Sequence, residues 1–230
     1  MIQSLGQRVI QLNNQAIEVA IEGYRKDGVV ILQQALALLL TVQENNKVSV
    51  ATRSCEQQRA RRTYSVPLSR KQCSQTFDDI FQFYDRAITF AEDDERFSTL
   101  SCPRTCTHIQ ATILYNLGVI CHKEAVCSGT STMAFVNALQ FYAGAYTSLE
   151  SSPILDDDAI LLVLSLFNNM GHIHSSFMMD SGKTQLCVSW MQSTFAAPHT
   201  HHALSPHDYD FFSQYISVPA ESQLAISPAA

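Results

Sequence analysis

The sequence has few charged residues and no long apolar run. Charged residues make up 16% of the 230, whereas apolar types make up 46%. A chain this poor in charge is not typical of a solvated, disordered polymer, so we expect extensive burial. The longest strongly apolar runs, 35–42 and 159–167, are far shorter than a membrane span. The sequence therefore predicts a globular protein that does not cross a membrane.

Sequence motifs of the common catalytic sites are also missing. The chain contains no nucleophile elbow, no phosphate-binding glycine loop, no HExxH pair and no dinucleotide fingerprint. Cys121 and His122 are neighbours in the sequence, but on a helix they point roughly 100° apart and cannot act together as nucleophile and base. We therefore predict a protein that is not an enzyme and binds no cofactor. A metal-dependent or hydrolytic enzyme is the least favoured alternative.

Ligands for a metal ion are too few in any one stretch. Cys102, Cys106 and His108 are close in the sequence, but zinc usually takes four ligands, and the fourth would have to be a distant residue such as Cys73. We interpret this stretch as a loop and a helix start. The C-terminal part has four further histidines without an accompanying Cys or carboxylate pattern: His199, His201, His202 and His207. No metal site is predicted.

Charge and cysteine content bear on partners and compartment. The net charge of -6 and the pI near 5.7 do not favour nucleic acid as the main partner. The seven cysteines are an odd number with irregular spacing, which is not typical of a secreted disulfide framework. The N-terminal residues show no basic start followed by an apolar run, as a secretory signal would. We expect an intracellular protein, cytoplasmic or nuclear.

Residues 107–150 carry the clearest structural pattern. Their first half places Ile109, Ile113 and Leu117 on one helical face, and their second half places Phe135 and Tyr142 on another. A Ser/Gly/Thr break separates the two halves. Two amphipathic helices joined by a polar turn predict a helical hairpin, whose apolar faces need further helices to cover them.

Two more stretches repeat this organisation. Residues 10–45 and 157–196 each contain two helical patterns, with predicted breaks at residues 25–28 and 180–183. Residues 197–230 are predicted to form a His- and Pro-bearing loop and a short helix. That helix should begin near Asp208 and bury three aromatic residues: Phe211, Phe212 and Tyr215.

An insertion, residues 46–109, separates the first two hairpins. Within it, residues 48–75 hold six basic residues and one acidic residue, a net charge of plus five, and we predict an exposed, mobile stretch. This basic loop could bind an acidic partner, nucleic acid or a nuclear importer through five of its residues: Arg59, Arg61, Arg62, Arg70 and Lys71. Residues 77–90 are aromatic and β-branched, which predicts an extended segment or small hairpin lying on the helices.

The hairpins are internally similar, which indicates a repeat array. The first helices share a motif of Asn, a variable residue and a small residue, which reads Asn14-Gln15-Ala16, Asn116-Leu117-Gly118 and Asn169-Met170-Gly171. The small residue would let a partner helix approach closely. The second helices share a small–large–small pattern, at Gly28, Leu32 and Ala35, at Ala138, Tyr142 and Ala145, and at Cys187, Met191 and Thr194.

This set resembles the tetratricopeptide repeat (TPR) in a divergent form, of the kind seen in diatoms. The resemblance covers residues 10–45, 110–150 and 157–196, about half of the chain. It departs from the standard repeat because no proline closes the first repeat and Gly28 stands where alanine is expected. It implies an all-α fold with residues 1–230 as a single domain, an α-solenoid of about three hairpins with a polar insertion and a short extended segment. It also implies a concave groove that binds peptides or partner proteins, and no enzymatic activity.

In the TPR family the first helices line the groove, which assigns a set of candidate binding residues. They are Tyr115, His122, Lys123, Asn168, His172, Ser175 and Ser176. Asn, His and Ser side chains with one Lys suit recognition of the backbone or hydroxyl groups of an extended peptide. The alternative is that several of these side chains are merely solvated. The leading hypothesis is an adaptor or scaffold that binds a protein or peptide segment in this groove, and the alternative is a regulatory protein that acts through its basic loop.

Overall fold

The computed structural model describes residues 4–46, 63–68, 81–91, 100, 102–129, 132–150 and 157–216. These residues are predominantly helical with one small two-stranded sheet, which confirms the predicted class. Six helices form three hairpins, which are α1 (Leu5–Ile21) with α2 (Arg25–Asn46), α3 (Pro103–Ser128) with α4 (Thr132–Glu150), and α5 (Asp157–Ser176) with α6 (Ser181–Phe195). The chain continues in α7 (Thr200–Ala203) and α8 (Pro206–Ile216).

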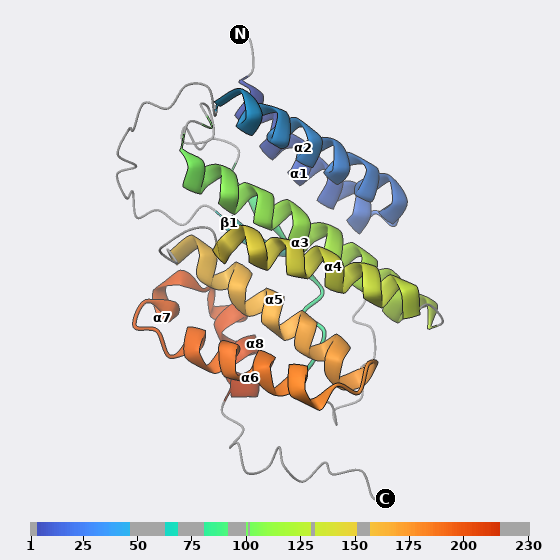
Figure 1. Cartoon of the computed structure of the whole chain (residues 1–230), viewed down its shortest axis with the longest axis vertical. Coiled ribbons are helices and arrows are strands. Elements are labelled where there is room, and N and C mark those ends of the chain that lie inside the picture. The colour runs from blue at the N-terminus through green and yellow to red at the C-terminus, as the bar shows by residue number, and fades with distance from the viewer. Residues whose placement is uncertain are drawn as a thin grey trace, which may run out of the picture.

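The three hairpins lie side by side in chain order (Figure 1). Within each hairpin the two helices pack together, and each second helix also contacts the first helix of the next hairpin, α2 on α3 and α4 on α5. The central hairpin is therefore covered on both sides. This order is compatible with a helical repeat.

Local sequence explains where the helices begin and end. Ser4 and Gln7 form a capping box at the start of α1, Pro103 is the first residue of α3, and the Asp180 side chain caps α6. Gly129, with φ of 65°, ends α3 in the left-handed conformation that glycine adopts without steric cost. The caps of α1 and α6 satisfy backbone N–H groups that a helix start leaves without partners, whereas Pro103 has no N–H to satisfy.

The predicted breaks at residues 25–28 and 180–183 are wrong by a few residues. The first turn falls at residues 22–24, where Gly23 has φ of 105°, and the second at residues 177–180. Gly28 lies inside α2 for a packing reason, because a Cβ atom there would stand 2.8 Å from the Ala16 carbonyl oxygen. Gly28 is therefore required by the contact between α1 and α2 and is not part of the turn.

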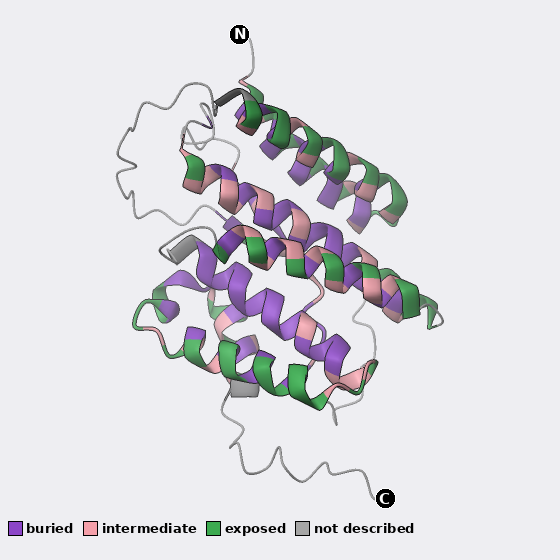
Figure 2. Ribbon diagram, in the orientation of Figure 1, coloured by how far each residue is buried: buried purple, intermediate pink, exposed green. Residues whose placement is uncertain are grey.

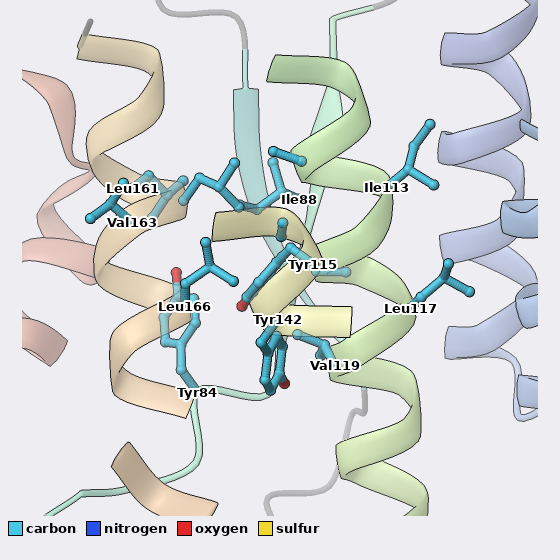
Figure 3. Close-up of a cluster of buried hydrophobic side chains, with 14 of the residues drawn as sticks. Tyr84, Ile88, Ile113, Tyr115, Leu117, Val119, Tyr142, Leu161, Val163 and Leu166 are labelled. Carbon is cyan, nitrogen blue, oxygen red and sulfur yellow. The ribbon is translucent and has the colours of Figure 1, made fainter. Parts of the chain in front are cut away.

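The small–large–small pattern of the second helices is buried throughout. In the central hairpin, a Cβ on Gly118 would stand 2.5 Å from Tyr142 Cε1, so the absence of a side chain at Gly118 lets this ring approach α3. Ile113 and Leu117 point from α3 toward the first hairpin, whereas Tyr115 and Tyr142 lie between α3 and α5 (Figure 3). α5 is buried along most of its length, while the outward faces of α2 and α6 are exposed (Figure 2).

The sheet consists of β1 (Thr63–Pro67) and β2 (Arg86–Phe90), which pair antiparallel with Ser65 opposite Ile88. The predicted extended segment is confirmed for residues 86–90, which form β2. The prediction of a mobile insertion is wrong for residues 63–68, because β1 pairs with β2 there and Leu68 is buried. The rest of residues 48–75, including all five basic-loop residues, lies outside the described residues.

Two further observations concern membrane spans and cysteines. None of the helices in the described part of the chain combines the length and the hydropathy needed to cross a membrane. Cys102, at the N-cap of α3, is disulfide-bonded, which the irregular cysteine spacing did not predict. Among the other described cysteines, Cys106, Cys121, Cys127 and Cys187 are free.

Candidate functional site

Residues 81–91, here called the inner segment, run across the first helices of the hairpins. The segment contacts α1 and α3 through β2, and its residue Tyr84 contacts α5. Phe81, Phe83, Ile88 and Phe90 are buried together with Tyr84. The face formed by α1, α3 and α5, here called the first-helix surface, is the one that the sequence predicted as a groove. The chain itself covers it.

One asparagine from each hairpin holds the inner segment by its backbone. Asn14 Nδ2 donates to the Phe90 carbonyl oxygen at 2.8 Å, and the Phe90 N–H donates to Asn14 Oδ1 at 3.1 Å. Asn116 makes the same two bonds with Ile88, both at 2.8 Å. Asn169 makes them with Tyr84, accepting at 2.9 Å and donating at 3.1 Å. Three side-chain amides thus each pair with both backbone groups of one residue.

Three neighbouring side chains extend this arrangement. Asn13 Nδ2 donates to the Ile88 carbonyl oxygen at 3.2 Å, and Asn13 Oδ1 accepts from Asn116 at 2.9 Å. The Tyr115 hydroxyl donates to the Arg86 carbonyl oxygen at 2.9 Å, and Asn168 Nδ2 donates to the Gln82 carbonyl oxygen at 2.8 Å.

The two edges of the inner segment therefore have different partners. Even-numbered residues from Gln82 to Phe90 turn backbone groups toward the helices, while the opposite edge pairs with β1 and receives the Leu68 N–H at the Asp85 carbonyl oxygen. Buried backbone groups must find hydrogen-bond partners. On the edge of the inner segment that faces the helices, the asparagine side chains supply these partners, in the position that a third strand would occupy in a larger sheet.

The glycine of the shared first-helix motif does not always face the same neighbour. Gly118 faces Tyr142 of its own hairpin, as the sequence predicted. A Cβ on Gly171, however, would stand 2.5 Å from Phe81 Cζ, so this glycine makes room for the inner segment and not for α6. The predicted helix–helix role of Gly171 is wrong.

Two of the predicted groove histidines form a buried pair. His122 Nε2 lies 3.0 Å from His172 Nδ1, and His122 Nδ1 lies 3.2 Å from the Tyr142 hydroxyl. The Tyr142 oxygen accepts from Asn169 Nδ2 at 3.3 Å, so its own hydrogen is available for His122 Nδ1. In the neutral tautomer in which Nδ1 accepts from Tyr142, His122 Nε2 carries the hydrogen and donates to His172. Burial lowers the pKa of His172 to about 4, and burial with the neighbouring His172 and Lys123 lowers the pKa of His122 well below its ordinary value.

An aromatic ring and an ion pair lie beside the histidines. The Phe83 ring centroid is 4.0 Å from that of His122 and 5.9 Å from that of His172. Lys123 Nζ lies 2.6 Å from Asp85 Oδ2; the Lys123 side chain is 2% exposed and that of Asp85 24%. These contacts place His122, His172 and Lys123 beneath the inner segment.

The other predicted groove residues fall into two groups. Tyr115 and Asn168 are buried at the inner segment and bond its backbone. Ser175 and Ser176 are half-buried near the end of α5, where Ser175 Oγ donates to the His172 carbonyl oxygen. The structure brings the first group together against a polypeptide, whereas these serine contacts stay within α5.

A carboxylate that sequence reasoning missed binds the other side of the inner segment. Asp208 of α8 accepts from the Tyr84 hydroxyl at 2.6 Å, from Ser65 Oγ at 2.7 Å and from Ser205 Oγ at 2.5 Å, and Arg86 Nε lies 3.7 Å away. Burial alone would raise the pKa of Asp208, but these hydrogen bonds and the Arg86 charge outweigh it and hold the pKa below its ordinary value.

Asp208 and its neighbours show what the predicted C-terminal helix does. The rings of Phe211 and Phe212 each lie 4.9 Å from that of Tyr84, between ring centroids. The Ser205-x-x-Asp208 spacing is a helix-start signal in the sequence. That signal marks the start of α8 and carries no information about Tyr84, which is 124 residues away.

The predicted Cys–Cys–His stretch has a different arrangement. The Cys102 sulfur is in a disulfide, and Cys106 Sγ donates to the Leu100 carbonyl oxygen at 3.2 Å. Within the described ranges, no group of three or more His, Cys, Asp or Glu side chains lies close enough together to hold a metal ion. The donors and acceptors gathered on the first-helix surface instead match a polypeptide backbone.

Comparison with protein families, curated proteins and solved structures finds no match to this chain.

Proposed function

We propose that the protein is a non-enzymatic interaction module, a TPR-like α-solenoid whose first-helix surface binds an extended polypeptide through its backbone. One observation carries this proposal. Each hairpin contributes an asparagine that pairs with both backbone groups of one residue, Asn14 with Phe90, Asn116 with Ile88 and Asn169 with Tyr84. The ligand of the adaptor is a partner's segment, and the inner segment is its internal counterpart.

Side-chain amides suit this task physically. An uncharged amide offers one acceptor and two donor hydrogens, so it satisfies the N–H and the carbonyl of one residue without burying a charge. Each such hydrogen bond contributes about 0.5–1.5 kcal/mol net. Since every non-proline residue has the same backbone groups, this contact fixes the register and direction of a peptide, and side-chain contacts supply the selectivity.

The inner segment sets a threshold for any partner. A tethered segment competes as if present at about millimolar concentration. A separate peptide of equal intrinsic affinity, supplied at about 10 µM, would then occupy about 1% of the chains. A physiological partner must bind about a hundredfold better than the inner segment, or bind when that segment is released. Without such a partner, the inner segment occupies the first-helix surface.

Cutting the chain on both sides of the inner segment tests the proposal. Protease sites are introduced within residues 69–80 and 92–99, and a fluorescein-labelled peptide of residues 81–91 is added to cut and uncut protein. We expect saturable binding, measured by fluorescence anisotropy, to the cut chain and about 1% occupancy of the uncut chain at 10 µM peptide. A cut chain that keeps its helices by circular dichroism and takes up no peptide contradicts the proposal.

A matched pair of variants separates recognition from general destabilisation. Asn116→Ala removes both amide contacts with Ile88 and should weaken peptide binding roughly tenfold, for two hydrogen bonds of modest strength. Asn137→Ala changes an exposed asparagine of α4 and should leave binding unchanged.

A further inference from the structure

We infer that the first-helix surface selects an extended peptide carrying an aromatic residue followed, two positions later, by an acidic one. This inference rests on the proposed function and names its ligand class. Its recognition elements are the buried Lys123 ammonium and the ring face presented by His122 and His172. The internal example is Phe83 and Asp85 in the inner segment.

The acidic position follows from Lys123. Its side chain is 2% exposed, and Asp85, 2.6 Å away, is the carboxylate paired with it among the described residues. A buried ammonium without a counter-ion is strongly unfavourable. A peptide that covers this surface without bringing a carboxylate would leave Lys123 unpaired. Lys123 therefore discriminates against neutral and basic side chains at this position.

The aromatic position follows from the rings around Phe83. His122 lies 4.0 Å from Phe83 between ring centroids and His172 5.9 Å. The two imidazoles are backed by Phe135, at 5.7 Å from His122, and by Phe177, at 5.4 Å from His172. Together these rings surround Phe83 with aromatic partners, against which an aromatic ring packs favourably.

The spacing of two residues follows from extended geometry. Side chains at positions i and i+2 of an extended chain point to the same face. Phe83 and Asp85 therefore both meet groups in the C-terminal half of α3, Phe83 at His122 and Asp85 at Lys123, which are consecutive residues. An aromatic and an acidic residue that were adjacent in a peptide would point to opposite faces, and only one could bind there.

Peptide exchange on the cut chain tests the selectivity. The probes are labelled peptides of residues 81–91 in the parent sequence, with Asp85→Asn, and with Gln82→Ala as a matched control, since only the backbone of Gln82 is bonded to Asn168. We expect Asp85→Asn to raise the Kd roughly a hundredfold, as when a buried pair loses one partner. The Gln82→Ala peptide should bind like the parent.

A charge exchange gives the reciprocal readout. Lys123→Glu protein should prefer the Asp85→Lys peptide over the parent peptide, reversing the preference of the unchanged protein. Lys183→Glu, at an exposed lysine of α6, should leave the original preference in place. If cutting abolishes the helices, the parent peptide and the Asp85→Lys peptide are compared on uncut Lys123→Glu protein. In that variant Asp85 of the inner segment faces a glutamate, so the inner segment should compete less well with an added peptide.

The outcomes separate this inference from the proposed function. Equal Kd values for the parent and Asp85→Asn peptides overturn the inference and leave backbone recognition standing. A folded cut chain that binds none of the peptides overturns both. On uncut Lys123→Glu protein, a preference for the Asp85→Lys peptide supports the inference, and equal binding of the two peptides overturns it.

Discussion

Gly118 and Gly144 both lie inside helices of the central hairpin, but a side chain would meet different surroundings at each. A Cβ on Gly118 would stand 2.5 Å from Tyr142 Cε1, whereas one on Gly144 would stand 3.6 Å from Leu114 Cδ1, an ordinary contact. We expect Gly118→Ala to lower the free energy of unfolding by about 1–3 kcal/mol because it overpacks the hairpin. Gly144→Ala should raise it by up to about 1 kcal/mol, since alanine favours the helix.

Urea unfolding of the two variants measures both effects. Opposite signs are the expected result, because overpacking dominates at Gly118 and helix propensity dominates at Gly144. If Gly118→Ala is as stable as the parent protein or more stable, the Tyr142 ring does not need the space at Gly118.

At this scale the sequence predicted residue types better than their roles. Asn116 and Asn169 were recognised as a repeated signature because they recur at matching helix positions. Their binding of Ile88 and Tyr84 was not predictable, since it depends on where an intervening segment lies after folding. The repetition reveals equivalent positions; it does not reveal what occupies the space in front of them.

Among the secondary-structure elements, α8 joins the rest of the fold both by aromatic packing and through the Asp208 carboxylate. Asp208 accepts from side chains of the inner segment, of β1 and of the turn before α8. In Asp208→Asn an amide donor replaces one carboxylate oxygen and meets hydroxyl donors. We expect a loss of about 3 kcal/mol in the free energy of unfolding, typical of breaking a buried charged network.

The control for this change is Asp210→Asn, at an exposed position two residues further along α8. It should change the stability by no more than about 0.5 kcal/mol. Both variants are compared by urea denaturation at pH 7, where the Asp208 carboxyl is ionised because its pKa is held below the ordinary value. Equal stabilities of the two variants would mean that α8 does not depend on the Asp208 network.

The elements also show which signals in the sequence are reliable. All six hairpin helices are predicted by apolar periodicity. The pattern is clear because each helix is long enough to repeat it over several turns. β1 was missed because its neighbours in the sequence are polar and basic, and a five-residue strand in such a stretch has no periodicity of its own. Its pairing with β2 is a long-range contact that local composition does not encode.

For the whole molecule, the buried histidine pair makes stability depend on pH. Burial lowers the folded-state pKa of His172 to about 4, and burial with the neighbouring His172 and Lys123 lowers the pKa of His122 well below its ordinary value. In the unfolded chain both groups titrate near about 6.5. Between about pH 6.5 and 4 the unfolded chain therefore binds more protons, so stability is full above this window and falls as the pH falls through it.

We expect the loss from His172 alone to be about 3 kcal/mol at the acid end of the window. The midpoint of urea unfolding between pH 7.5 and 4 measures it, with His172→Gln against His201→Gln, an exposed histidine of α7. The first variant should lose a large part of the pH dependence and the second should retain it. A parent protein whose midpoint is constant over this range contradicts the buried neutral pair.

The asparagine contacts also impose an order on synthesis. Phe90 emerges from the ribosome after its partner Asn14, but Ile88 precedes Asn116 by 28 residues and Tyr84 precedes Asn169 by 85. At a synthesis rate of about 5–20 residues per second, Asn169 is made about 4–17 s after Tyr84. The nascent segment can therefore dock only from its C-terminal end toward its N-terminal end, one hairpin at a time. Until α5 emerges, the aromatic end of the segment is newly made and lacks its α5 partners, so its apolar side chains and backbone groups are open to aggregation unless a chaperone binds them.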